Sequence, residues 1–121
     1  MTRILVVDDE PALREAVADV LRDEGYTVLT AADGRAGLDL FASDVPDLVL
    51  MDVMMPRMDG REACLAMRAH PTGRTIPIIL SSAEIPPVSL DPSISAFLAK
   101  PFDLDRLIRL VAHLLADGSP R

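Results

Sequence analysis

Five short apolar runs, spread along nearly the whole chain, limit the possible folds more than any other feature of the sequence. They cover residues 4–7, 27–30, 47–51, 76–80 and 96–99 and are rich in β-branched and aliphatic residues. Most of them lack the alternation of apolar and polar residues that marks a half-exposed strand. Continuous apolar runs are typical of strands that are covered on both faces, as in a parallel sheet.

Amphipathic helical patterns separate most of these runs. They span residues 10–24, 34–43, 60–69 and 103–116, and each places apolar residues on one stripe at helical spacing. The order is therefore βαβαβαβ, then an irregular link, then βα. This order predicts an α/β domain in which right-handed crossovers place helices on both faces of a parallel sheet.

Capping residues, proline and glycine indicate where the first helix begins and ends. Asp9 is expected to be the N-cap of helix 10–24, with Pro11 in its first turn and Gly25 just beyond its last residue.

Segment 84–94 stands where another helix would complete the alternation of strands and helices. A regular helix is unfavourable there because the segment contains Pro86, Pro87 and Pro92.

Composition excludes several classes of protein. The 121 residues suffice for one domain with a real core, and half of them are apolar. The formal charge of −7 disfavours direct binding to nucleic acid or to anionic lipid. Cys64 is the single cysteine, so the chain has no internal disulfide and no cysteine-based zinc site, and we expect Cys64 in the core. The apolar run after Arg3 meets charge again at Asp8, too early for a signal peptide or membrane span, which predicts a cytoplasmic protein.

Polar residues follow the apolar runs at the points where ligands gather in such sheets. These residues are Asp8-Asp9, Asp52, Ser81-Ser82 and Lys100-Pro101. Each alone has an ordinary structural explanation, such as a helix cap, a turn residue or a surface lysine. Together, three carboxylates at one edge repel one another unless a cation is present. Oxygen ligands favour Mg²⁺, and an aspartate beside Mg²⁺ can act as a nucleophile toward a phosphoryl group.

The chain also resembles a known family. The segments "ILVVDDEP", "DLVLMDVMMPRMDG", "PIILSSAE" and "FLAKPF" are similar, in this order, to the motifs of the response-regulator receiver domain of two-component signalling. The resemblance covers about residues 2–116. It implies a flavodoxin-like, doubly wound, five-stranded parallel sheet of order 2-1-3-4-5. We expect the receiver domain over residues 1–116 and a flexible tail or linker stub over residues 117–121.

The resemblance implies a role for each candidate site residue. Asp52 is the expected phosphoacceptor, Lys100 binds the phosphoryl group, and the Lys100–Pro101 bond is expected to be cis. Ser82 is the expected switch hydroxyl and Phe97 the expected aromatic switch residue. The expected cofactor is Mg²⁺, with Mn²⁺ as a substitute; its ligands would be Asp8, Asp9, Asp52 and the backbone carbonyl of Met54.

The function that these roles imply is a phosphorylation-controlled signalling switch. A sensor histidine kinase or a phosphotransfer protein would donate the phosphoryl group, and the surface around Phe97 and residues 84–95 would change in response. The output would be a downstream protein or an output domain outside this chain. We expect no enzymatic activity beyond phosphotransfer to Asp52 and slow autodephosphorylation.

Two other functions compete with this interpretation. One is a Mg²⁺-dependent phosphatase with an aspartyl nucleophile, as in the haloacid dehalogenase class, although "DDE" lacks the spacing of that class. The other is a pseudo-receiver that binds partners without being phosphorylated, against which the complete set of site residues argues.

The proline-containing segment sets the chain apart from its expected relatives. Receivers ordinarily have a helix between the fourth and fifth strands, but this segment is short and rich in proline. We expect a loop there, and we expect the protein not to use the dimer that many receivers form across this surface. His70 and His113 are expected to face solvent rather than to take part in a phosphorelay.

Overall fold

Strands and helices alternate along the chain as the sequence predicts. The computed structural model describes residues 2–55, 58–73, 75–83 and 94–118. In these ranges the elements are β1 (Arg3–Val7), α1 (Pro11–Asp23), β2 (Thr27–Ala31), α2 (Gly34–Ser43), β3 (Leu48–Asp52), α3 (Gly60–Ala69), a short 3₁₀ turn (Pro71–Gly73), β4 (Ile78–Ser82), β5 (Ala96–Ala99) and α4 (Leu104–Gly118).

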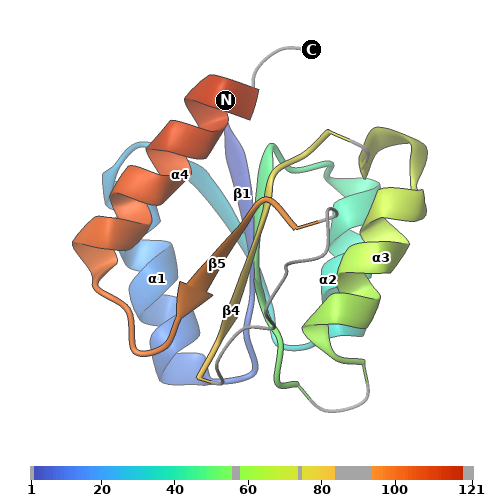
Figure 1. The fold of residues 1–121 in the computed structure, drawn as a ribbon, viewed down its shortest axis with the longest axis horizontal. Coiled ribbons are helices and arrows are strands. Elements are labelled where there is room, and N and C mark those ends of the chain that lie inside the picture. The colour runs from blue at the N-terminus through green and yellow to red at the C-terminus, as the bar shows by residue number, and fades with distance from the viewer. Residues whose placement is uncertain (1, 56–57, 74, 84–93, 119–121) are drawn as a thin grey trace.

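The five strands form one parallel sheet in the order β2-β1-β3-β4-β5. Helices α1 and α4 cover one face of this sheet, and α2 and α3 cover the other (Figure 1). The predicted flavodoxin-like fold is therefore confirmed. Because all the strands run in the same direction, the residues that follow β1, β3, β4 and β5 meet at one edge of the sheet.

A separate apolar cluster fills the space between each face of the sheet and its helices. Successive strand residues point to opposite faces, so neighbouring residues of one strand enter different clusters. Toward α2 and α3 lie Leu5, Val7, Phe41, Val49, Met51, Ala63, Cys64, Met67, Ile78 and Leu80 among others. Toward α1 and α4 lie Ile4, Val6, Val17, Leu21, Leu48, Leu50, Ile79, Leu98, Leu107 and Val111 among others.

The start of α1 differs from the prediction. Glu10, not Asp9, is the N-cap, and its side chain makes no capping hydrogen bond. Pro11 lies in the first turn and fixes where the helix begins, so the cap falls on the residue before it. The end of α1 agrees with the prediction, since Gly25 follows the C-cap with φ of 96°.

Strand β4 is displaced from its predicted position by two residues. The expected run began at residue 76, but the strand spans Ile78–Ser82. Pro77 has no N–H group to donate to a neighbouring strand. At the other end Ser81 still pairs with Asp52 and Ser82 with Ala99, so the polar residues belong to the strand itself.

Some expectations concern residues outside the described ranges. The loop expected in place of a helix between β4 and β5 falls almost entirely on residues 84–93, which are among them. Helix α4 continues to Gly118, two residues past its predicted end, and residues 119–121 lie outside the described part. Within the described residues, no helix combines the length and apolarity needed to cross a bilayer.

Candidate functional site

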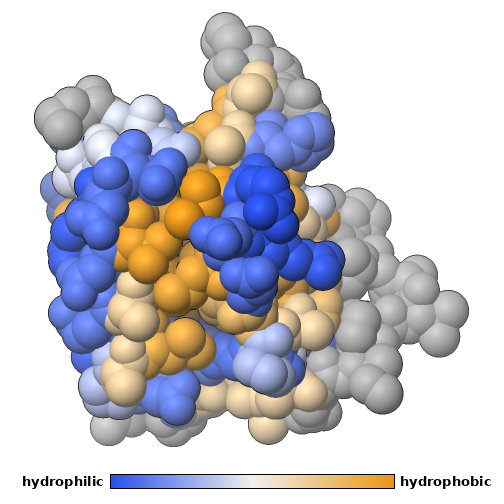
Figure 2. Space-filling model, turned by 90° about the vertical axis from the view of Figure 1, so that its left-hand side faces the viewer, coloured by the Kyte–Doolittle hydropathy of each residue, from blue (hydrophilic) through white to orange (hydrophobic). Residues whose placement is uncertain are grey.

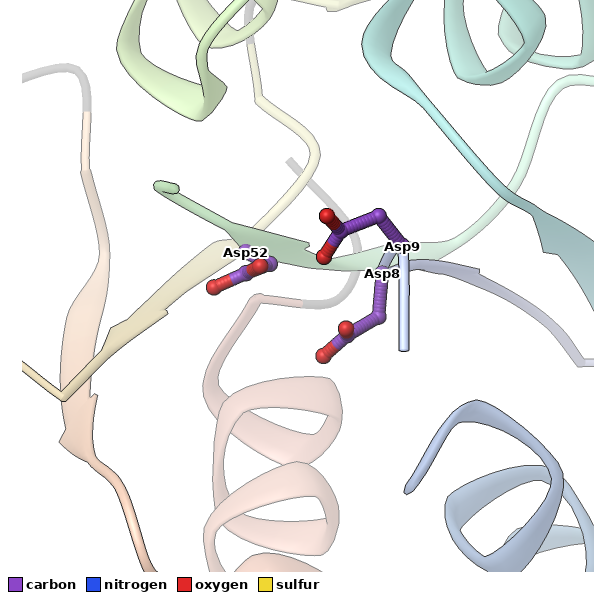
Figure 3. A group of neighbouring side chains, drawn as sticks. All are labelled: Asp8, Asp9 and Asp52. Atoms are coloured by element: carbon purple, nitrogen blue, oxygen red, sulfur yellow. The ribbon is translucent and has the colours of Figure 1, made fainter. Parts of the chain in front are cut away.

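Three carboxylates meet at the carboxyl edge of the sheet. Asp8 and Asp9 follow β1, and Asp52 is the last residue of the neighbouring strand β3 (Figure 3). One carboxylate oxygen from each residue lies within 4.8 Å of the others. Asp8 and Asp52 are only 5% and 3% exposed, whereas Asp9 is open to solvent. Two of the three charges are therefore largely removed from water, which is costly without a counter-charge.

Lys100 supplies part of that counter-charge from the end of β5. Its Nζ lies 2.9 Å from Asp8 Oδ2 and 3.1 Å from Asp52 Oδ1. The backbone N–H of Lys100 donates to the carbonyl of Ser82 at 2.8 Å, and the bond from Lys100 to Pro101 is cis, as expected from the sequence. One ammonium thus faces three carboxylates, so the cluster keeps an excess of negative charge.

The titration of the site reflects this imbalance. Burial raises the pKa of Asp52, the nearby charge of Asp8 raises it further, and the opposing effect of Lys100 does not cancel the two. Burial by itself would lower the pKa of Lys100, but hydrogen bonds and charge pairing with Asp8 and Asp52 raise it overall. The ammonium therefore stays charged, while the Asp52 carboxylate is the group whose ionisation the fold opposes.

Backbone and side-chain contacts that sequence reasoning missed hold Asp8 in place. The N–H of Glu10 donates to Asp8 Oδ1 at 2.9 Å, and the Arg14 guanidinium donates to the carbonyl of Asp8 at 2.9 Å. The contact could have been anticipated from the sequence, because Arg14 lies six positions after Asp8 on the first turns of the expected helix.

Gly60, the first residue of α3, lies directly against the end of β3. A Cβ at this position would stand 2.3 Å from the carbonyl oxygen of Asp52 and 2.9 Å from the Cα of Val53. The N–H of Gly60 also donates to the carbonyl of Val53 at 3.0 Å. Only glycine allows α3 to begin this close to Asp52, which explains the "DG" at the end of the second motif segment, "DLVLMDVMMPRMDG".

The predicted switch residues lie on neighbouring strands. Ser82 is buried at the end of β4, and Phe97 is half-buried on β5. Phe97 pairs with Leu80, and Ser82 lies two residues beyond Leu80, so all three point to the same face of the sheet. That face is the one covered by α2 and α3, since both Leu80 and Phe97 belong to its cluster.

Met54, predicted as a backbone ligand, lies in the loop after β3, two residues beyond Asp52. Its side chain is 57% exposed and covers no part of the core. Met54 thus presents an apolar side chain to solvent at the edge where the carboxylates meet.

Comparison with known proteins agrees with this geometry. The model of the response regulator receiver domain matches residues 4–112. This chain belongs to the receiver domain family. It is 44% identical over 98% of its length to the response regulator MprA of Mycolicibacterium vanbaalenii, and 42% identical to MprA of Mycobacterium avium. It spans about half of these relatives, at 52% and 53% of their length.

Solved receiver structures share the fold of this receiver domain. The chemotaxis response regulator CheY4 of Vibrio cholerae superposes with a TM-score of 0.87 at 32% identity, over 94% of this chain and 98% of that one. The response regulator TrrA of Thermotoga maritima, solved with Mg²⁺ and BeF, gives 0.84 at 38% identity over 94% and 99%. The receiver domain of PA1611 from Pseudomonas aeruginosa, with magnesium in its active-site cleft, gives 0.83 at 30% identity over 95% and 98%.

The donor set of this receiver domain suits the same kind of ion. Asp8, Asp9 and Asp52 offer only oxygen ligands, which a hard divalent cation such as Mg²⁺ prefers. A divalent cation would also remove the excess negative charge that Lys100 leaves. The residues present therefore fit a Mg²⁺ site.

Cys64 and the two histidines lie away from this site. Cys64 is buried in the core beside α3, as predicted. His113 is exposed on α4, also as predicted. The prediction for His70 was wrong: this residue caps the end of α3 and is half-buried, with its ring edge-on to Phe41 at 5.8 Å. Phe41 reaches the end of α3 from α2, a contact that the sequence pattern does not reveal.

Proposed function

We propose that this receiver domain is a phosphorylation-controlled signalling switch in which Asp52 accepts the phosphoryl group. The observation that carries the proposal is the position of the Asp52 carboxylate between Lys100 Nζ, at 3.1 Å, and the carboxylates of Asp8 and Asp9, within 4.8 Å. Burial and the charge of Asp8 raise the pKa of Asp52, and a phosphoryl group adds further negative charge there, so Lys100 and a divalent cation are needed to balance the phosphorylated site.

The donor is a phosphohistidine on a sensor histidine kinase or a phosphotransfer protein. An oxygen of the Asp52 carboxylate forms a bond to phosphorus as the bond from phosphorus to the donor's imidazole nitrogen breaks. The departing nitrogen keeps the bonding electron pair and takes a proton from solvent. The Lys100 ammonium lies close enough to neutralise the phosphoryl oxygens, and the Ser82 hydroxyl would donate a hydrogen bond to them.

Asp8, Asp9, Asp52 and the backbone carbonyl of Met54 would hold a Mg²⁺ ion, or Mn²⁺ in its place. Bound there, the ion would stabilise negative charge on the phosphoryl oxygens. Asp8 is already oriented by the N–H of Glu10, and so the metal site needs little rearrangement to form.

Ser82 and Phe97 form the switch in this proposal. They face the same side of adjacent strands, so a movement of Ser82 toward the phosphoryl group frees space that Phe97 can enter. Phe97 also lines a surface cavity of about 370 Å³ with Pro101, Phe102 and Arg106. A new position of Phe97 would therefore reshape this cavity and the surface near residues 84–95.

The donor and the target complete the proposal. A cavity of about 300 Å³ lies beside Lys100, lined by Glu10, Leu13, Ala83 and Phe102, and would admit an apolar part of the donor. The target is a downstream protein or an output domain, since the curated relatives are about twice as long as this chain. A cytoplasmic location, where histidine kinases present their phosphohistidine, is part of the proposal.

Phosphorylation with a small-molecule donor tests the assignment of Asp52. The purified chain is incubated with acetyl phosphate and Mg²⁺, and intact-mass spectrometry counts phosphoryl groups per chain. We expect one group that hydroxylamine removes, as it does an acyl phosphate, and none in Asp52→Asn or in the presence of EDTA. Asp39→Asn, at an exposed position of α2, serves as the charge-matched control and should behave like the wild type.

The same experiment separates the competing functions. Persistent labelling of Asp52→Asn at the wild-type rate would refute the assignment. Continuous release of inorganic phosphate over many turnovers of a phosphomonoester would instead support the phosphatase, and a wild-type chain that takes up no phosphoryl group would support the pseudo-receiver.

A further inference from the structure

The face formed by α1 and α4 carries an apolar stripe that lies mostly outside the signalling site, although Leu13 also lines the cavity beside Lys100. Figure 2 shows this stripe, in orange, running between two hydrophilic ridges. Both helices carry half-exposed apolar side chains and exposed alanines. The half-exposed residues are Leu13, Val20, Leu104, Ile108, Leu110, Leu114 and Leu115, and the exposed alanines include Ala12, Ala16 and Ala112.

Part of this stripe is not explained by the core. Leu13, Leu104 and Leu115 pack against the cluster under α1 and α4, so their exposed parts are the rim of a folded core. Val20 and Ile108 are also half-exposed, yet among the described residues they belong to neither core cluster. Their half-exposed side chains add apolar surface that the packing of the core does not account for.

The two helices flank the stripe with charges of opposite sign. On α1 the exposed charges are the acids Glu15, Asp19 and Asp23, with Arg22 as the exception. On α4 they include Arg109 and Arg106, the second of which also lines the cavity beside Phe97, with Asp105 as the exception. Arg22 is partly occupied within its own chain, since it donates to the carbonyl of Val28 at 3.3 Å and lies 3.6 Å from Asp19. The α1 side is therefore acidic and the α4 side basic.

We propose that this face binds a second copy of the same chain, as a symmetric dimer in which each α1 lies against the α4 of the other copy. An apolar centre with opposite charges on its two sides is self-complementary, which is what a twofold interface requires. The proposal concerns the unphosphorylated chain and does not rest on the function proposed for Asp52.

Charge decides between the two simplest symmetric arrangements, with the twofold axis either perpendicular or parallel to the helices. Helices α1 and α4 lie side by side and both begin at the carboxyl edge of the sheet (Figure 1). A twofold axis perpendicular to the helices would place α1 on α1 and so oppose Asp19 to acids. A twofold axis parallel to the helices places α1 on α4 at matching heights along the axes. The second arrangement joins acids to arginines and is the one we assign.

Asp19 and Arg109 are the best pair for a test. Each lies near the middle of its helix on the exposed surface, so both changes leave the core intact. Sedimentation equilibrium over a concentration series of the unphosphorylated chain measures the dimer dissociation constant. We expect a monomer–dimer equilibrium that Asp19→Arg and Arg109→Glu each weaken by about tenfold, since each change acts twice in a symmetric dimer.

Combining the two changes reverses the charge pattern without destroying its complementarity. The double variant should regain a dissociation constant within about threefold of the wild type. Asp39→Arg, on α2 at the opposite face, is the matched control and should leave the equilibrium unchanged. A chain that stays monomeric at every concentration would overturn the proposal, as would a dimer indifferent to these variants. Tight binding of another protein to this face by a monomeric chain would also overturn it.

Discussion

Replacing Asp52 by asparagine should make the protein more stable when no divalent cation is present. Asparagine has nearly the same shape as aspartate but no charge, so it leaves the packing at the end of β3 unchanged. It removes one of three carboxylates that lie within 4.8 Å of one another. It also takes away one of the two ion pairs of Lys100, which keeps its contact with Asp8 at 2.9 Å.

The size of the effect follows from opposing charge interactions. Two unit charges 4.8 Å apart repel by about 0.9 kcal/mol at the dielectric constant of water and by about 3.5 kcal/mol at an effective constant of 20. Asp52 has two such neighbours. Its attraction to Lys100 at 3.1 Å is about 1.3 to 5.4 kcal/mol on the same two assumptions, so the charges nearly cancel. The desolvation of Asp52 decides the sign, and we expect the free energy of unfolding to rise by about 1 kcal/mol.

Urea denaturation in EDTA, followed by circular dichroism, measures this difference. Its pH dependence has a definite sign. Because the pKa of Asp52 is raised in the folded state, the wild type regains stability relative to the variant as the pH falls through that folded-state value. The difference in free energy of unfolding between Asp52→Asn and the wild type is therefore greatest near neutral pH. It disappears as the pH falls toward about 4, where the unfolded aspartate is also protonated.

Adding Mg²⁺ should make the wild type more stable than Asp52→Asn, the reverse of their order in EDTA. An ion that binds only the folded state stabilises it in proportion to the logarithm of its concentration above the dissociation constant, and the variant lacks one ligand. Asp39→Asn should match the wild type in both conditions. The reasoning fails if Asp52→Asn unfolds at the same urea concentration as the wild type in EDTA, or at a lower one.

Three further changes probe the surroundings of Asp52. Gly60→Ala should lower the free energy of unfolding by about 2 kcal/mol and slow phosphorylation, because a Cβ would stand 2.3 Å from the Asp52 carbonyl oxygen; urea denaturation and mass spectrometry measure the two effects. Lys100→Met should cost about 3 kcal/mol in EDTA, because it leaves two buried carboxylates unpaired. Met54→Asn should speed the loss of phosphate from the phosphorylated chain, because the apolar side chain stands beside the expected path of attacking water.

Each of these three predictions has a result that would contradict it. Arg61→Ala, at the next and exposed position of α3, is the control for Gly60→Ala, and equal stability of the two variants would remove the steric argument. A Lys100→Met variant as stable as the wild type in EDTA would mean that water already screens the carboxylates. An unchanged dephosphorylation rate in Met54→Asn would rule out a role for that side chain.

The sequence predicts the layers of the fold well because burial on both faces of a parallel sheet leaves a strong pattern. Helices α2 and α3 begin and end at the predicted residues, and their starts are fixed by Asp33 and Asp59, each of which caps a helix with a side-chain hydrogen bond. The pattern misplaces a strand whose bounds differ from those of the apolar run. Strand β4 ends at Ser82, because a polar residue can keep its backbone pairing when the neighbouring strand continues beside it.

Contacts between distant segments account for the rest of what the sequence could not predict. The role of Gly60 depends on how closely α3 approaches β3, and the position of His70 depends on a ring from α2. The acidic site was predictable because it depends on the order of the strands and not on contacts between distant side chains. Acids at the ends of adjacent parallel strands must meet at one edge once the strand order is known, whatever the loops between them do.

The surface over α1 and α4, unlike the Asp52 site, could not be predicted from the sequence. Asp19 and Arg109 lie 90 positions apart in the sequence, and neither belongs to a motif. Each helix read alone has an ordinary charged outer face. Opposite charges and an apolar centre arise only when the fold sets α1 beside α4. A charge exchange between these two positions therefore tests a property that the fold creates, and it does so while the Asp52 site stays intact.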